Sequence, residues 1–280
     1  MKSIVSSLAA TALLAACNEA AVESPTAPAA TARATSAATS AATGVSTTPG
    51  ARATARSESD AGGAKAIDEE TESYFFEYSW PAEAGRDPAL AAELQARADT
   101  SRSELEAQAR EAQADAAAND YPFRKHSLGM EWQKVADIPG FLSLSGEFYT
   151  YMGGAHGMSG MSSLIWDREA GRAIEGIDLF TSPQALGRAL GSRICAGLND
   201  ARREKLGEVP AGAECPAIGE FTVLVGSSNG AYFDRLTLYA GPYVAGPYAE
   251  GSYEVDLAID GKTRAAVKPR YRSAFAPPSQ

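Results

Sequence analysis

Residues 148–160 read Phe-Tyr-Thr-Tyr-Met-Gly-Gly-Ala-His-Gly-Met-Ser-Gly. The aromatic residues at the start of this stretch predict a β-strand. Four glycines then fall within eight residues, around His156, which is one of only two histidines in the chain. Because glycine adopts backbone conformations that other residues avoid, the stretch predicts a tight corner onto which strands on both sides fold. We call residues 148–160 the glycine corner.

The chain on either side of the corner alternates between strand and helix patterns. A first helix is expected from Pro88 to about Ala118, with Asp87 as its cap and Pro88 at its first position. A second begins at Ser182-Pro183 and ends near Gly207. Strand patterns cover residues 72–80, 128–132, 142–148, 161–166, 221–225, 232–239 and 252–259. This order predicts an α+β fold, with a curved antiparallel sheet packed against two main helices in two interlocked modules.

The first residues have the pattern of an export signal. Lys2 precedes an apolar run that is too short to span a bilayer and is typical of a secretory signal peptide, assigned to residues 1–16. The tetrapeptide Leu-Ala-Ala-Cys at residues 14–17 looks like a bacterial lipobox, with Cys17 as the lipidation site. The alternative is an ordinary signal peptide with a chance cysteine. Because several acyl chains anchor a protein firmly, we expect an exported protein tethered to the cell envelope.

Asn18 stands where lipoproteins of the inner membrane often carry Asp, which favours the outer membrane and periplasm.

Composition sets the domain limits. Residues 17–66 hold the lipidated cysteine and an Ala/Thr/Ser/Pro-rich segment without aromatic residues, which predicts a disordered tether. Residues 67–152 and 153–265 form the two modules, and residues 266–280 are expected to be a frayed tail.

Charge and cysteine content limit the partners. A net charge of −10 argues against nucleic acid and favours a basic protein or a cationic ligand. Plain solubility is the alternative explanation. With Cys17 lipidated, Cys195 and Cys215 remain as a pair in an oxidising compartment and predict a disulfide. A metal or nucleophile role is the rival interpretation, but no histidine lies near either cysteine; neither a metal site nor a cofactor is expected.

His156 has three interpretations: a structural residue fixed in the glycine turn, a ligand contact, or a catalytic base. Catalysis would need a second histidine or a carboxylate to orient the ring, and Glu147, Asp167 and Asp178 are only near in sequence. No catalytic residue is therefore assigned.

Aromatic and glycine residues at the corner and in the Pro/Gly-rich segment 239–251 form the candidate ligand site. Rigid tyrosine rings stack on sugars and anchor interfaces at a low entropic cost. The alternative is that these tyrosines belong to the sheet and core. The candidate ligand-binding residues are Tyr149, Tyr151, Gly153, Gly154, His156, Tyr243 and Tyr248.

Several motifs occur here in one order: the glycine corner, Trp166-Asp167 with the Gly171 turn, Ile-Asp-Leu-Phe at 177–180, and the run 246–255. Together they resemble a bacterial extracytoplasmic module. That module pairs the N-terminal domain of the peptidoglycan deacetylase PdaC, at roughly residues 70–152, with the domain of the lysozyme-sensing anti-sigma factor RsiV, at roughly residues 153–262.

The chain departs from both relatives in ways that limit what the resemblance implies. The deacetylases carry their chemistry on a separate metal-binding domain, and the sensors carry a transmembrane helix; the chain has neither pattern. The resemblance therefore implies a non-catalytic envelope lipoprotein that binds peptidoglycan glycan or a wall-targeting basic protein such as lysozyme. The alternative is a cell-wall polysaccharide-processing enzyme, a deacetylase or hydrolase, centred on His156.

Overall fold

The computed structural model describes residues 55–275, apart from the side chains of residues 55–57 and 61. The expected signal peptide, lipidation at Cys17, most of the tether and the end of the tail lie outside these residues. No helix in the described range is both long enough and apolar enough to cross a bilayer.

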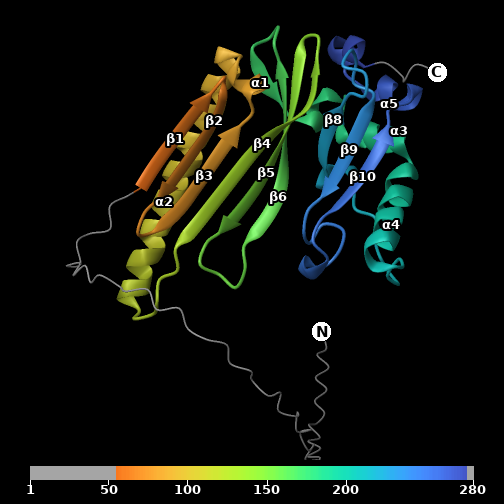
Figure 1. Ribbon diagram of the computed structural model, residues 1–280. Helices are drawn as coiled ribbons and strands as arrows, with labels where there is room; N and C mark the ends of the chain where they lie inside the picture. Colours follow the sequence, from red (N-terminus) through yellow and green to blue (C-terminus); the bar gives the residue numbers. More distant parts are fainter. Residues whose placement is uncertain (1–54, 276–280) are drawn as a thin grey trace, which may run out of the picture. The chain divides into compact units, whose positions relative to one another are not determined.

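Two β-sheets build the fold (Figure 1). The larger sheet has seven strands in sequence order, all antiparallel except for the parallel pair β3–β4, which α2 connects. The smaller sheet has the order β10-β9-β8. The strands are β1 (Ala55–Ala61), β2 (Ala64–Glu70), β3 (Tyr74–Trp80), β4 (His126–Ile138), β5 (Phe141–Tyr151), β6 (Met158–Asp167), β7 (Arg172–Ile174), β8 (Thr222–Gly226), β9 (Arg235–Ala240) and β10 (Tyr253–Ala258). The predicted α+β class is confirmed.

Helix α2 (Pro88–Ala118) begins where the sequence predicts. The Asp87 carboxylate accepts hydrogen bonds from the backbone N–H groups of Ala89 and Leu90, as an N-cap does. Its apolar stripe is buried against β3 and β4, and the helix lies behind the strands in Figure 1. The remaining helices are α1 (Ala82–Gly85), α3 (Pro183–Leu190), α4 (Arg193–Leu206) and α5 (Gly261–Ala266), with short 3₁₀ turns η1 (Gly176–Leu179), η2 (Ile218–Glu220), η3 (Tyr248–Glu250) and η4 (Pro269–Ala274).

Strands β4–β6 take part in two hydrophobic cores. Leu142, Leu144 and Leu164 belong to the core beneath α2. Ile138 and Ile165 belong to a second core with β8–β10, α3 and α4. A register shift between Lys134 and Ala136 interrupts the alternation of β4. Since β6 pairs with β5 along its whole length, the two predicted modules share one sheet, and the boundary at residue 152 falls inside a hairpin.

The structure corrects four predictions of local structure. A hairpin, β1–β2, occupies the end of the expected tether; Gly62 and Gly63 both have positive φ, the backbone that a two-residue turn requires. The second helix is two helices, broken at Gly191 with φ 56°. The strand expected at residues 232–239 begins only at Arg235, so the β8–β9 loop spans residues 227–234. The tail is packed up to Phe275, which is fully buried.

Glycines in strands β5 and β6 are covered by aromatic rings of the neighbouring strand. Gly146 pairs with Trp132 and Gly160 pairs with Phe148. A Cβ added at Gly160 would lie 2.3 Å from the Phe148 ring, and one at Gly146 would lie 2.9 Å from the Trp132 ring. The absence of a side chain at these positions therefore lets the rings lie against the sheet.

We predict that Gly160→Ala lowers the free energy of unfolding by about 1–3 kcal/mol, because the new methyl group overpacks the Phe148 ring. Gly154→Ala is the control, since a Cβ there meets nothing within 4 Å. Urea unfolding of both variants measures the difference. Equal stability of Gly160→Ala and the parent chain would contradict this account of the glycine.

Candidate functional site

The glycine corner connects β5 to β6 through residues 152–157. Gly153 has φ 81°, a backbone conformation that L residues rarely adopt. The Tyr149 ring lies across Gly157, where an added Cβ would be 2.3 Å from it. The Tyr151 hydroxyl donates a hydrogen bond to the Gly154 carbonyl at 3.0 Å, which closes the loop on its own strand. Glycine conformation and aromatic packing thus fix the corner.

Residues from the segment between β9 and β10 meet this corner. The His156 ring stacks on Tyr248, with centroids 4.0 Å apart and planes 28° apart. Tyr243 packs on Tyr248 at 5.5 Å, and its hydroxyl lies 3.5 Å from His156 Nε2. The Tyr248 hydroxyl donates to the Gly157 carbonyl at 2.9 Å. We call His156, Tyr243 and Tyr248 the aromatic cluster.

The seven predicted ligand-site residues therefore gather at one place. Gly153, Gly154 and Tyr151 shape the loop, while the aromatic cluster and Tyr149 form its surface. Tyr149 is 47% exposed and Tyr243 is 59% exposed. Met152 and Met158 add exposed apolar surface on the same loop. Exposed rings that carry hydroxyl groups and an imidazole are suited to contact with a ligand that has both apolar surface and hydroxyl groups.

Among the residues that the structure describes, no carboxylate forms a hydrogen bond or ion pair with the His156 ring. Its Nδ1 lies 2.9 Å from the Gly157 carbonyl, and its Nε2 faces the Tyr243 hydroxyl. Asp167 instead accepts from the backbone of residue 170, within the β6–β7 turn. Within residues 55–275 no group of three His, Cys, Asp or Glu side chains has the arrangement of a metal site. The ring is held by backbone and aromatic contacts.

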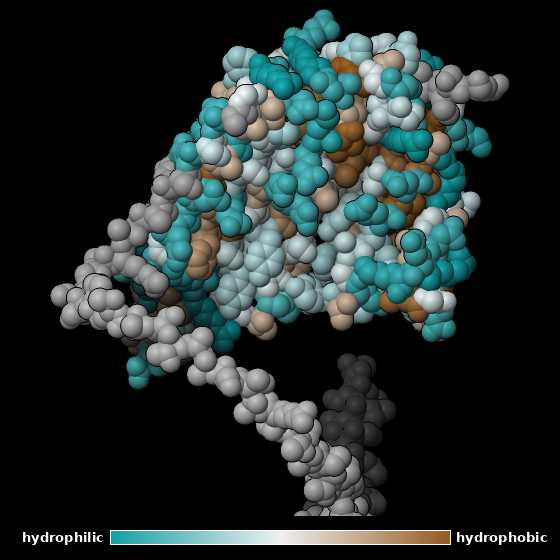
Figure 2. All heavy atoms as spheres, viewed as in Figure 1, coloured by the Kyte–Doolittle hydropathy of each residue, from teal (hydrophilic) through white to brown (hydrophobic). Residues whose placement is uncertain are grey.

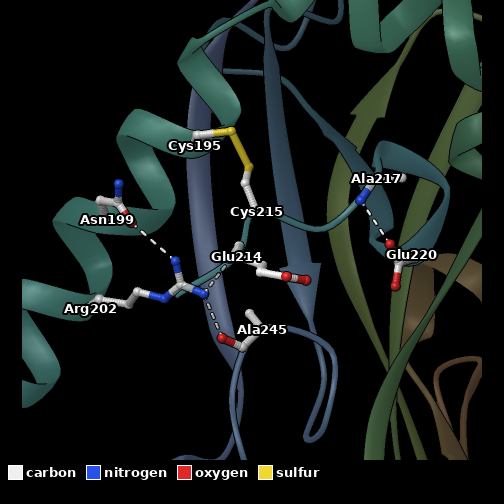
Figure 3. Close-up of a disulfide and its surroundings, with 8 residues drawn as sticks. All are labelled: Cys195, Asn199, Arg202, Glu214, Cys215, Ala217, Glu220 and Ala245. Carbon is white, nitrogen blue, oxygen red and sulfur yellow. Dashed lines mark hydrogen bonds between the residues drawn. A yellow bond between two sulfur atoms is a disulfide. The ribbon is translucent and has the colours of Figure 1, made fainter. Parts of the chain in front are cut away.

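A buried arginine positions the segment that carries Tyr243 and Tyr248 (Figure 3). Arg202 on α4 is 2% exposed. Its guanidinium donates to the carbonyls of Glu214 at 2.7 Å and Ala245 at 2.6 Å, and to the Asn199 amide oxygen at 3.0 Å. Ala245 lies between the two tyrosines in sequence. The arginine therefore ties the aromatic segment to α4.

The predicted disulfide between Cys195 and Cys215 is confirmed, with Cα atoms 5.5 Å apart. It joins α4 to the loop that also supplies the Glu214 carbonyl, as Figure 3 shows. Closing a loop of 20 residues stabilises the fold by about 3 kcal/mol in the chain-entropy model. The disulfide and Arg202 together hold both loops against one helix.

Arg202→Met should destabilise the fold by about 2–4 kcal/mol, because the buried Ala245 carbonyl and the part-buried Glu214 carbonyl lose their donor. Arg203→Ala provides the comparison, since this neighbouring arginine pairs with Asp200 on the surface and its loss should cost about 0.5 kcal/mol or less. Chemical denaturation with the disulfide intact measures both. Similar losses for the two variants would show that the buried hydrogen bonds are unimportant.

His126 follows Arg124 and Lys125, a sequence context that predicts a surface position, but the structure buries it. It is 3% exposed, at the start of β4 beneath the corner, with Gly153 and the Phe123 ring as neighbours. Within the described residues neither ring nitrogen has a hydrogen-bond partner. Burial lowers the pKa of the His126 imidazole below its ordinary value, so the folded chain holds it neutral.

The unfolded chain binds a proton at His126 more readily than the folded chain does. Stability should therefore be greatest above the unfolded pKa of about 6.5 and fall as the pH drops from there through the lower folded pKa. His126→Leu should reduce this dependence, whereas His156→Ala should retain it. Urea unfolding between pH 7.5 and 5 tests this; an unchanged pH dependence in His126→Leu would refute it.

A cleft of about 1110 Å³ was not predicted from the sequence. It is lined by residues of α2, of strands β3, β4, β6 and β7, of the segments around η1 and η2, and by Lys268 and Arg270. Its lining combines hydroxyl groups, aromatic rings and charges of both signs. The lining residues are spread along the sequence from Tyr78 to Arg270, so no local sequence pattern could have indicated the cleft.

The opposite face of the larger sheet is acidic. Asp68 on β2 lies directly across from Glu77 on β3, and Glu131 on β4 lies across from Glu147 on β5. With Tyr149 they line a hollow of about 490 Å³. Figure 2 shows this face mostly in hydrophilic and intermediate colours. Like charges placed directly opposite each other are unfavourable within a sheet, so this surface favours a positively charged neighbour.

Residues 67–159 match the family model described as Deacetylase PdaC. The match covers about one third of the chain, from β2 to the first residues of β6, and includes His156. Among solved structures, a DUF3298 family member from Bacteroides fragilis NCTC 9343 is similar, with 14% identity and a TM-score of 0.42, over 74% of this chain and 89% of that chain. A DUF3298 family protein from Pseudomonas aeruginosa PAO1 has 18% identity and a TM-score of 0.41, over 80% of this chain and 96% of that chain. No curated protein matched.

Proposed function

We propose that the chain is a non-catalytic binding module of the bacterial cell envelope, lipid-anchored through Cys17, whose ligand is cell-wall polysaccharide. The observation that carries this proposal is the aromatic cluster. Its exposed rings are fixed by backbone contacts at the corner and by the Arg202 tie to α4. Preformed aromatic surfaces bind sugar rings without a large loss of side-chain conformational entropy.

The geometry favours contact over catalysis at His156. Within residues 55–275 no carboxylate forms a hydrogen bond or ion pair with the ring, whose Nδ1 lies 2.9 Å from the Gly157 carbonyl and whose Nε2 lies 3.5 Å from the Tyr243 hydroxyl. The matching family model is named for the deacetylase PdaC, and the resemblance of the motifs to a peptidoglycan deacetylase supports a cell-wall polysaccharide as the ligand class. A polysaccharide-processing enzyme centred on His156 remains the alternative that the experiment below must exclude.

A basic wall-targeting protein such as lysozyme is a second candidate ligand. The acidic face formed by Asp68, Glu77, Glu131 and Glu147 supports it, together with the net charge of −10. Opposite charges would speed association and make binding sensitive to salt. This candidate places the contact on the sheet face and leaves the aromatic cluster free.

Tyr243→Ala should weaken binding to purified peptidoglycan by roughly five- to thirtyfold, because it removes the most exposed ring of the cluster. Tyr232→Ala, which removes another exposed tyrosine outside the cluster, should bind as the parent chain does. Sedimentation with insoluble peptidoglycan measures binding of the full chain.

The same preparation distinguishes the alternatives. Release of acetate or sugar from peptidoglycan by the parent chain, and its loss in His156→Ala, would refute the non-catalytic proposal and show an enzyme instead. Salt-sensitive binding to lysozyme that Tyr243→Ala leaves intact, without binding to peptidoglycan, would favour the second candidate. Absence of binding to both would refute the proposed binding function.

A further inference from the structure

Three cationic side chains meet at one end of the large cleft. Arg172 on β7 donates a hydrogen bond to the Tyr271 hydroxyl at 2.7 Å, and the Arg270 guanidinium lies 4.6 Å from the centre of the same ring. Lys268 donates to the Asp178 carbonyl at 2.6 Å. All three side chains line the cleft. We call Arg172, Lys268 and Arg270 the cation group.

The cation group has neutral partners. A hydroxyl, a ring and a backbone carbonyl contact it, and within the described residues no carboxylate forms an ion pair with any of the three. Exposed arginines elsewhere, such as Arg110 and Arg168, pair with neighbouring carboxylates. Because the three cations gather without such pairs, their N–H groups remain available to an anionic group of a ligand.

The surrounding wall limits the charge that a ligand can carry. Glu175, Asp178 and Glu220 line the same cleft, where Glu93 and Arg97 also pair with each other, so the lining carboxylates offset the charge of the cation group. A singly charged carboxylate suits this balance better than a doubly charged phosphate. The planar guanidinium forks of Arg172 and Arg270 also match the two oxygens of a carboxylate.

The rest of the cleft is suited to hydroxylated rings. Thr100 and Ser101 on α2 and Ser162 on β6 line it with hydroxyl groups. The Tyr78 ring borders the cleft but is buried, and its hydroxyl accepts a hydrogen bond from the Trp132 indole N–H at 2.9 Å. The lining hydroxyl groups can form hydrogen bonds with the hydroxyls of a saccharide.

We propose that the cleft binds an oligosaccharide bearing carboxylate groups, with the cation group as the site that recognises the carboxylates. This inference rests on the proposed polysaccharide binding and adds a second site that selects acidic over neutral chains. Tight binding then requires a ligand with carboxylates spaced along hydroxylated rings.

Calorimetry of the full chain at low salt tests the proposal with two oligosaccharides of equal length. One contains N-acetylglucosamine alone, and the other alternates it with N-acetylmuramic acid, which adds one carboxylate per disaccharide. The acidic oligosaccharide should bind about tenfold more tightly, as expected for charge-assisted hydrogen bonds in a solvated cleft. Added salt should reduce this preference.

The double variant Arg172→Gln/Arg270→Gln should lose the preference and keep the affinity for the neutral oligosaccharide. Arg188→Gln/Arg235→Gln is the matched control, because both arginines are exposed and neither lines the cleft. Thermal unfolding of each variant confirms that it is folded.

Equal affinities of the parent chain for the two oligosaccharides would overturn the inference and leave the proposed function standing. A preference that survives in Arg172→Gln/Arg270→Gln, or tighter binding of a phosphorylated oligosaccharide of the same length, would also overturn it. Failure of both oligosaccharides to bind would overturn the inference together with the proposed function.

Discussion

The structure depends on strands β4–β6, which are buried on their α2-facing side and, at the end that contains Ile138 and Ile165, on the opposite side as well. Their α2-facing side chains fill one core, and the opposite side chains at their far ends fill the other. The two hydrophobic cores therefore share the same three strands. Glycines opposite Trp132 and Phe148 let large rings pack where two further side chains would not fit. The glycine corner joins β5 to β6 at the other end of these strands, which hold it in place.

The candidate site joins residues that are almost a hundred positions apart. His156 belongs to the β5–β6 hairpin, whereas Tyr243 and Tyr248 belong to the segment before β10. That segment is held by a buried guanidinium, whose desolvation is costly unless its N–H groups find acceptors. The carbonyls of Glu214 and Ala245 supply them. A buried cation thereby positions exposed rings, which fits a surface that must keep its shape before its ligand arrives.

Local signals in the sequence predicted much of this fold. Asp87 and Pro88 marked the start of α2, because a cap and a proline act within one turn of helix. The seven site residues gathered as expected, since the corner and the tyrosine-rich segment each carried a strong local pattern. The expected PdaC-like domain at roughly residues 70–152 agrees with the family model that matches residues 67–159, whereas the RsiV-like domain stays a prediction.

Features that depend on distant contacts were missed or misjudged. Strand β1 has the composition of a tether and forms a strand only because β2 pairs with it. His126 follows two charged residues in sequence, yet the fold buries it. Phe275 looked like part of a loose tail, but it packs against Phe180 and Phe233. The cleft and its cation group are assembled from four or more segments, which no periodicity can reveal.

We have proposed that the aromatic cluster is a contact surface whose shape is fixed before a ligand binds. The most direct measurement is an NMR titration of the full chain with soluble peptidoglycan fragments, following the ring resonances of His156, Tyr243 and Tyr248. The account predicts ligand-dependent shifts of these rings, with the backbone resonances of the corner well dispersed before any ligand is added. Binding that leaves all three rings unshifted would contradict it.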